Sequence, residues 1–342
     1  MDTLPEPATE RQQEVRIVAV LRLRIVDYLL EAFKDGSISN CKLKMVFVNE
    51  MAEDHDGVSR DVYTAFWDQF LEHCEGEDER VPRLRPDYSE VEWAAVGRIW
   101  VKGLLDHGVL PVKLSKAFIL SCIHGIDSVP KDVLLSSFLQ FISPSERSAL
   151  ANALKGNLDE SDEDDLLDLY TRMGSHKLPP KDDLEASIQT MAHKAIIQEP
   201  KFIVDCFHAS ISSSEMTPSD KDCVLGLYEK KRANGKKVAQ LLEPMDNMNP
   251  RESVVFNHLQ RFIKSADQSK AEKILRFFTG ANVICVEKIQ VSFNGESGLG
   301  RRLVAHTCGP VLEVPYTYLS YPEFRVEFDN ILSSNYLDMD IR

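Results

Sequence analysis

The spacing of apolar residues changes near residue 250, and this change constrains the fold more than any other feature of the sequence. Before it, apolar side chains recur at helical spacing in several segments, including 89–106, 131–142 and 182–211. After it, residues 289–293 alternate between apolar and polar, and residues 311–314 form a second short strand pattern. A chain of 342 residues is long enough for two domains. We therefore expect a mainly helical region of about 245 residues, followed by a mixed α/β region of about 95 residues.

The region before residue 70 predicts a helix, a strand and a second helix. Residues 11–34 are apolar around much of a helical circumference, which is typical of a helix that is buried on several sides. Leu43, Met45 and Phe47 alternate with other residues at the period of a β-strand. Ser59 then has the position of an N-cap, because apolar residues at helical spacing follow it.

Four further segments predict connections or helix ends. The run Asp159–Asp168 is mostly acidic and predicts a solvated loop that leads into a helix, rather than an acidic docking tail. The segment Pro244–Pro250 has no periodicity and contains two helix breakers, so it predicts a linker. Asn294-Gly295 has the chemistry of a turn at the end of a strand. Ser320 and Glu323 have the spacing of a capping box at the start of the last helix.

Charge excludes some classes of partner. The chain carries 54 acidic and 40 basic residues, and its formal net charge is −14. A sequence-independent nucleic-acid binder needs a basic surface, so we expect no nucleic-acid partner. The basic cluster Lys230–Arg232 with Lys236 and Lys237 is typical of a solvated helix end, and a nuclear-import signal or an acidic docking contact are its alternatives. Charged residues interrupt the apolar stretch Val15–Phe33, so we expect no membrane partner.

Seven cysteines are scattered along the chain, and no CxxC pair occurs. Neither a zinc site nor a dithiol redox site is indicated, so we expect no metal and no cofactor. The first residues lack the basic region of a secretory signal, and the pattern is typical of reduced thiols in the cytoplasm or the nucleus. Cys122 and Cys206 occur in apolar helical runs, which predicts that they pack in a core.

Cys308 is different, because it lies in a loop between the strand patterns of the tail. Such a loop can expose the thiol, and a thiolate is the nucleophile in cysteine chemistry. If residues 306–308 are extended, His306 and Cys308 project to the same side, and the imidazole influences the thiol or orders the loop. The neighbouring segment Gly295–Arg302 lacks the ending of a phosphate-binding loop and predicts a flexible hairpin loop. The chain has no HExxH or GxSxG motif.

The tail resembles the C-terminal lobe of HECT-type ubiquitin ligases. The matching residues, in order, are Arg276–Gly280, Ala305–Cys308 and Leu312–Pro315 with Tyr318 and Tyr321. In that family the first element is a Phe-x-Thr-Gly signature, the second holds the catalytic cysteine, and the third ends a strand. Upstream segments also resemble the family, and they are Leu43–Phe47, Glu50, Asp54, Asp56–Asp61, Val96–Arg98, Lys102-Gly103, Leu110-Pro111 and Ile196–Gln198.

The resemblance implies an α+β fold that is bilobal, with a hinge between the lobes. Residues 1–36 would be a polar leader and helix, and residues 37–247 a large, mainly helical N-lobe. A subdomain at about 126–190 would dock a conjugating enzyme. Residues 248–342 would be a smaller, mixed α/β C-lobe that carries the catalytic cysteine, with Pro244–Pro250 as the hinge.

The resemblance also implies an enzyme, a ubiquitin-protein transferase, whose partners are ubiquitin and a ubiquitin-conjugating enzyme. Cys308 would accept ubiquitin as a thioester and pass it to a substrate lysine. His306 and Thr307 are candidate supports, with local hydrogen bonding as the alternative for both. Asp338 and Asp340 are candidate counterparts of an acidic residue near the family's C-terminus.

The residues after Cys308, and two phenylalanines in the middle of the chain, allow other interpretations. The family usually has Phe-Asn after the cysteine, whereas this chain has Gly309-Pro310, so a catalytically weak binding module that recruits conjugating enzyme or ubiquitin is the principal rival. A cysteine hydrolase is a weaker rival to the ligase, since no Asn or Asp partner motif accompanies Cys308. Phe138 and Phe141 are candidate contacts for the conjugating enzyme, and burial in the core is their alternative.

Overall fold

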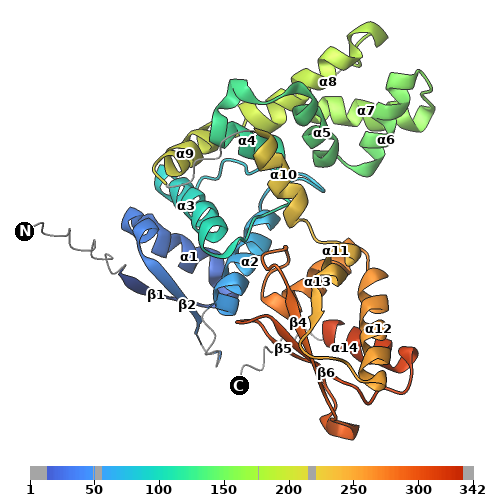
Figure 1. Ribbon diagram of the computed structural model, residues 1–342. Coiled ribbons are helices and arrows are strands. Elements are labelled where there is room, and N and C mark those ends of the chain that lie inside the picture. Colours follow the sequence, from blue (N-terminus) through green and yellow to red (C-terminus); the bar gives the residue numbers. More distant parts are fainter. Residues whose placement is uncertain (1–13, 49, 51–55, 176, 215–220, 334–342) are drawn as a thin grey trace, which may run out of the picture.

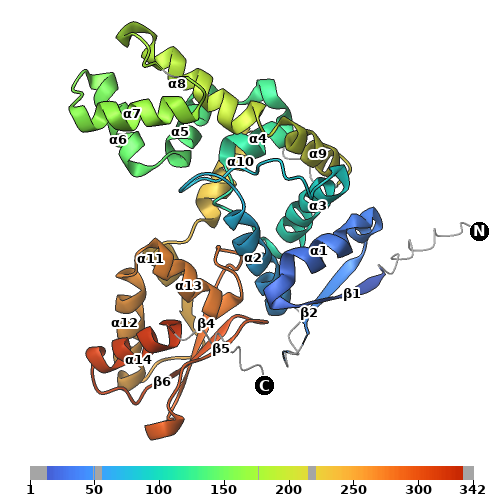
Figure 2. The same cartoon turned by 180° about the vertical axis from the view of Figure 1, so that it is seen from behind.

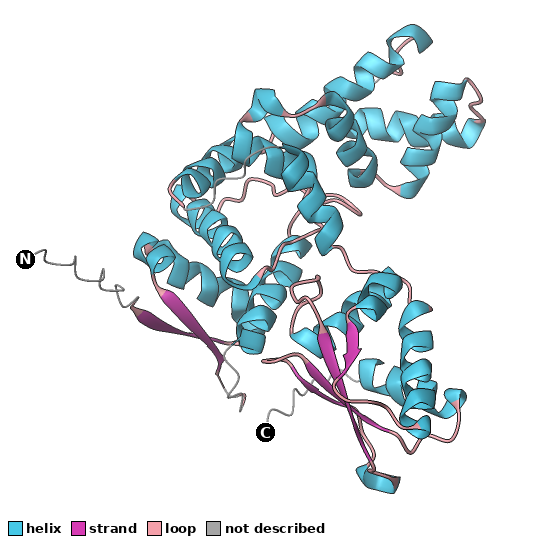
Figure 3. Cartoon of the chain, viewed as in Figure 1, coloured by secondary structure: helices cyan, strands magenta, loops and turns pink. Residues whose placement is uncertain are grey.

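The computed structural model describes residues 14–48, 50, 56–175, 177–214 and 221–333. In this part of the chain the fold is α+β, with many helices and two small sheets (Figures 1 and 3). No helix in these described ranges is both long and apolar enough to cross a bilayer.

The elements up to residue 231 are mostly helical. They are β1 (Val15–Val20), α1 (Ile25–Lys34), β2 (Lys42–Phe47), α2 (Asp56–Glu72), α3 (Glu90–His107), α4 (Lys116–His124), α5 (Lys131–Phe141), α6 (Pro144–Lys155), α7 (Glu160–Arg172), α8 (Leu184–His193), α9 (Lys201–Ser212) and α10 (Lys221–Lys231). A π-helical segment, Lys194–Gln198, follows α8. Figures 1 and 2 both show α6, α7 and α8 at the opposite end of the molecule from β4 and β6.

The remaining elements form a four-stranded sheet with helices beside it. They are α11 (Gly235–Gln240), β3 (Leu242–Pro244), α12 (Pro250–Lys264), α13 (Gln268–Thr279), β4 (Ile289–Asn294), β5 (Val304–His306), β6 (Val311–Pro315) and α14 (Tyr321–Ser333). The strand order is β3-β4-β6-β5, and only β5 and β6 are antiparallel. The connection from β5 to β6 is therefore a tight reversal at one edge of the sheet, and it contains Cys308.

Buried apolar side chains form two clusters. The first contains buried residues from Val18 to Tyr228, and also Ala281 and Val283 from far along the chain. The second runs from Ala233 to Phe328 and includes the stacked rings of Phe262 and Phe328, whose centroids are 4.6 Å apart. Because Ala281 and Val283 directly follow α13, the second half of the chain is anchored in the core of the first.

Several local predictions are confirmed. The strand patterns correspond to β2, β4 and β6. α14 begins at Tyr321, and the Glu323 amide donates to Ser320 Oγ at 3.4 Å, while the Glu323 carboxylate accepts from the Leu319 amide at 2.8 Å. Short polar motifs of this kind predict helix ends well because both partners lie within one turn.

The helix predicted for residues 11–34 is wrong over its first half. Residues 11–13 lie outside the described part of the chain, Val15–Val20 is strand β1, and the α-helix begins only at Ile25. β1 pairs in parallel with β2, with Val18 opposite Met45. A continuous apolar run is compatible with a buried helix or a strand, and here β-branched valines and a partner strand favour the strand.

Two predicted helix starts are also displaced. α2 already includes Asp56, so Ser59 is a fully buried residue within the helix and not its N-cap. The acidic run is not a loop, because α7 begins at Glu160 with Asp159 as the N-cap and Asp162 completing a capping box. Carboxylates in the first turn stabilise a helix through its dipole, which explains why such an acidic sequence is helical.

The segment Pro244–Pro250 does not separate the two clusters. β3 ends at Pro244 and pairs with β4, and Pro250 begins α12, so the segment lies within the second cluster. The segment Gly295–Arg302 is not a hairpin loop either, because β6 lies between β4 and β5 in the sheet, but β4 does end at Asn294 as its turn chemistry predicts. The segment that follows contains a short 3₁₀ turn, Gly298–Gly300. Both differences arise because strand order is set by long-range pairing, which local turn chemistry does not reveal.

Candidate functional site around Cys308

The seven cysteines differ in accessibility. All lie in the described part of the chain, and none forms a disulfide. Only Cys223 and Cys308 are exposed. Burial raises the pKa of Cys206 to about 11, and it also raises the pKa of Cys122 and Cys285. Since the thiolate is the reactive form, the buried thiols are poor nucleophiles, and the expected core packing of Cys122 and Cys206 is confirmed.

Cys308 lies in the turn that connects β5 to β6. β5 ends at His306, residues 307–310 form the turn, and Val311 begins β6. Thr307 is 1% exposed, whereas Cys308 is exposed, so the turn buries one side chain and presents the next. The extended backbone does not reach residue 308, and strand alternation therefore does not relate His306 to Cys308 as expected.

His306 is engaged with a residue of the neighbouring strand. Its Nε2 lies 2.9 Å from Oε1 of Glu313 in β6. Thr307 contributes its backbone carbonyl, which accepts a hydrogen bond from the guanidinium of Arg60. Local hydrogen bonding, the alternative for both residues, is therefore present at His306, whereas the bond to the Thr307 carbonyl comes from a residue 247 positions away.

Arg60 connects the Cys308 turn to the first cluster. It extends from the second turn of α2 and is 8% exposed. Its Nε donates to the carbonyl of Thr279 at 2.7 Å, and its Nη2 donates to the carbonyl of Thr307. One guanidinium therefore joins the end of α13 to the residue that immediately precedes Cys308.

An ion-pair network lies beside this contact. Asp61, next to Arg60, has a side chain only 3% exposed and accepts from Nη2 of Arg276 at 2.8 Å and from Nη2 of Arg22 at 2.7 Å. Arg276 also binds Asp68 through Nη1 at 2.7 Å. The buried carboxylate of Asp61 is thus paired with two guanidinium groups, which is the condition for a buried charge to be tolerated.

Gly280 allows α13 to approach α2 closely. Its φ is +81°, a left-handed conformation that favours glycine, and it ends α13 as the C-cap. A Cβ atom at this position would lie 2.4 Å from the carbonyl oxygen of Gly57 in α2. The contact between the two helices therefore requires the absence of a side chain at residue 280.

We expect Gly280→Ala to destabilise the protein by about 2 kcal/mol, because left-handed strain adds to a backbone clash. Gly298→Ala is the matched control: its φ is +62°, but nothing lies within 4 Å of its added Cβ. In that variant the free energy of unfolding should fall only by the cost of the left-handed backbone conformation, about 1 kcal/mol. Urea denaturation of both variants measures the difference, and equal losses would contradict a steric role for Gly280.

The structure brings together three segments that are far apart in the sequence: 56–61, 276–280 and 305–308. Sequence reasoning singled out Cys308, His306 and Thr307 but gave no role to Arg60 or Asp61. A signal existed, because both lie in a segment that carried the family resemblance. The candidates Asp338 and Asp340 lie outside the described residues.

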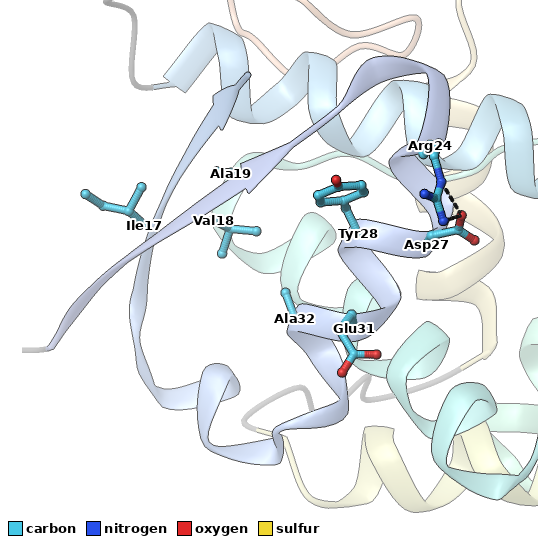
Figure 4. Close-up of a pocket in the computed structure, with 8 residues that line it drawn as sticks. All are labelled: Ile17, Val18, Ala19, Arg24, Asp27, Tyr28, Glu31 and Ala32. Atoms are coloured by element: carbon cyan, nitrogen blue, oxygen red, sulfur yellow. Dashed lines mark hydrogen bonds and ion pairs between the residues drawn. The ribbon is translucent and has the colours of Figure 1, made fainter. Parts of the chain in front are cut away.

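Two grooves on the described part of the chain are lined by residues away from the Cys308 turn. One of about 570 Å³ lies between β1 and α1 and is lined by residues such as Val18, Tyr28 and Ala32 (Figure 4). Another of about 590 Å³ lies beside α5 and α8. Small-molecule enzymes usually enclose their substrates in such pockets, whereas an exposed thiol on a turn suits a macromolecular substrate.

Phe138 and Phe141 are 0% and 1% exposed, so their interpretation as core residues is confirmed.

In the described part of the chain, no group of three or more His, Cys, Asp or Glu side chains is arranged to hold a metal ion. A comparison with protein-family models gave no match, and a search of curated protein sequences gave none either.

Proposed function

We propose that this chain is a HECT-type ubiquitin ligase with Cys308 as its nucleophile. One observation carries the proposal: the segments that resemble the family in the N-terminal half, in α13 and at Cys308 meet around Arg60. The exposure of Cys308 and the burial of Thr307 support the same assignment. If these short motifs matched the family by chance, their segments would not be expected to meet in the folded chain.

The proposed architecture is bilobal, with each lobe built around one of the two clusters. The hinge is then Arg232–Asn234, the non-helical residues between α10 and α11, because Tyr228 belongs to the first cluster and Ala233 to the second. A few such residues are sufficient to absorb a lobe rotation. This replaces the hinge expected at Pro244–Pro250.

We assign docking of the conjugating enzyme to the helices at about residues 126–190, at the end of the molecule that contains α6 and α7. These helices carry exposed large apolar side chains, including Leu154 at 52% and Leu167 at 44% exposure. Apolar side chains on such a surface are suited to binding a protein partner.

The proposed reaction consists of two acyl transfers. The Cys308 thiolate attacks the thioester carbonyl of the charged conjugating enzyme, a new thioester forms, and the conjugating enzyme's cysteine departs as a thiolate. A neutral substrate amine then attacks the Cys308 thioester. An isopeptide bond forms, the amine loses a proton, and the Cys308 thiolate is regenerated. We assign the chain to the cytoplasm or the nucleus, where free cysteines such as these seven are kept reduced.

The test is a charging assay with the wild-type chain, activating enzyme, a panel of conjugating enzymes and ubiquitin. A ubiquitin adduct that disappears with reductant is expected, and added free lysine should discharge it. Stable binding of a charged conjugating enzyme without an adduct would instead support the binding-module alternative. Absence of both the adduct and binding across the panel would contradict the proposal.

A further inference from the structure

The Cys308 turn depends on a side chain that belongs to a different hydrophobic cluster. Thr307 and Cys308 follow a strand of the second cluster, whereas Arg60 lies in α2 of the first. The interaction joins residues 247 positions apart. The Pro310 carbonyl, at the end of the turn, accepts a hydrogen bond from the Gln290 amide of β4 at 2.8 Å. The Thr307 carbonyl, at the start of the turn, is held from outside this sheet, by Arg60 of α2.

We propose that Arg60 is a positioning residue for Cys308, an inference that rests on the proposed function. Its two donors fix the carbonyls of Thr279 and Thr307, and Thr307 is fixed relative to the body of the first cluster. The Cys308 peptide follows directly, so the direction in which the thiol or its thioester points is determined by α2. Arg60 itself does not touch the reacting atoms in this role.

Arginine is suited to this task because its planar guanidinium presents several donors in a fixed geometry. A lysine has a single nitrogen at the end of a flexible chain, so it would hold the two carbonyls less rigidly. Arg60 is also only 8% exposed, which limits competition from water. Misplacement of a reacting group by about 1 Å can lower a rate by about 100-fold, so a small loss of order in this turn should be measurable.

The bond from Arg60 to the Cys308 turn depends on how α2 and α13 are arranged. Arg60 holds the turn only while α2 and α13 are in contact, as the pairing of Arg276 with Asp61 and Asp68 maintains here. Separation of these helices would release Thr307. The ordered Cys308 turn therefore belongs to the arrangement in which α2 and α13 are in contact.

The test compares Arg60→Met, Arg60→Lys and the matched control Arg22→Met. Arg22 binds Asp61, the neighbour of Arg60 on α2, at 2.7 Å. It has no hydrogen bond to either of the carbonyls that Arg60 holds. Hydrogen exchange should accelerate locally in residues 304–310 of Arg60→Met, with little change in β4. Single-turnover discharge of the Cys308 thioester to free lysine should fall by about ten-fold or more, with Arg60→Lys intermediate.

A merely structural role would produce a different result. Arg22→Met would then loosen residues 304–310 and slow discharge as much as Arg60→Met, and that outcome would overturn the proposal. Unchanged exchange and discharge in Arg60→Met would overturn it as well. If the wild-type chain forms no thioester, the proposed function fails, while the exchange comparison still decides whether Arg60 orders the turn.

Discussion

Cys308→Ala is expected to abolish the reductant-sensitive ubiquitin adduct completely. The nucleophile of a thioester transfer has no substitute on the turn, because Thr307 is buried at 1% exposure and burial raises the pKa of the nearby Cys285 thiol. Cys308→Ser should give an adduct that resists reductant, since a serine hydroxyl forms an oxygen ester in place of a thioester. Gel electrophoresis with and without reductant distinguishes the three proteins.

Cys223→Ala is the matched control for this experiment. Cys223 is the other exposed cysteine, but it lies on α10 and outside the three segments that meet around Arg60. We expect this variant to form the adduct at the wild-type level. Retention of the adduct in Cys308→Ala, or its loss in Cys223→Ala, would move the nucleophile away from residue 308.

Asp61→Ala is expected to lower the free energy of unfolding by about 3 kcal/mol. The carboxylate is 3% exposed and lies between Arg22 and Arg276, so its removal leaves two cations beside a site from which water is largely excluded. The loss falls at the lower end of the range for a broken buried pair because each arginine retains a second carboxylate, Glu50 or Asp68. Urea denaturation followed by circular dichroism measures it.

Asp205→Ala provides the comparison for Asp61→Ala. Asp205 pairs with Lys201 at 2.6 Å on α9, but its side chain is 60% exposed. Exposed pairs of this kind contribute about 0.5 kcal/mol or less, so this variant should be nearly as stable as the wild type. Similar losses in the two variants would show that burial does not determine the contribution of Asp61.

Local motifs predicted helix ends where both partners lie within one turn. Ser320 and Glu323, for example, lie together at the start of α14. The same reasoning failed for Ser59, because the helix already includes residues 56–58 and Ser59 is buried within it. It failed for Val15–Val20 as well, since the strand depends on its pairing with β2 and an apolar run does not reveal its partner.

The candidate site was predictable only in part. The position of Cys308 between strand patterns predicted its exposure, because a turn at the edge of a sheet has little to cover it. The role expected for His306 depended on extended backbone through residue 308, but the strand ends at His306. Arg60 was not predicted as part of the site, because no local pattern relates it to carbonyls 219 and 247 positions away.

The sequence by itself determined the α+β composition, the starts of several helices such as α3, α5 and α14, and the identity of one thiol in a loop between strands. These features depend on periodicity and capping, whose partners lie within a few residues of each other. The tertiary structure alone decided the strand order β3-β4-β6-β5, the position of the boundary between clusters, and the anchoring of the Cys308 turn by Arg60. Each of these depends on contacts between distant segments, which form only when burial of apolar surface brings those segments together.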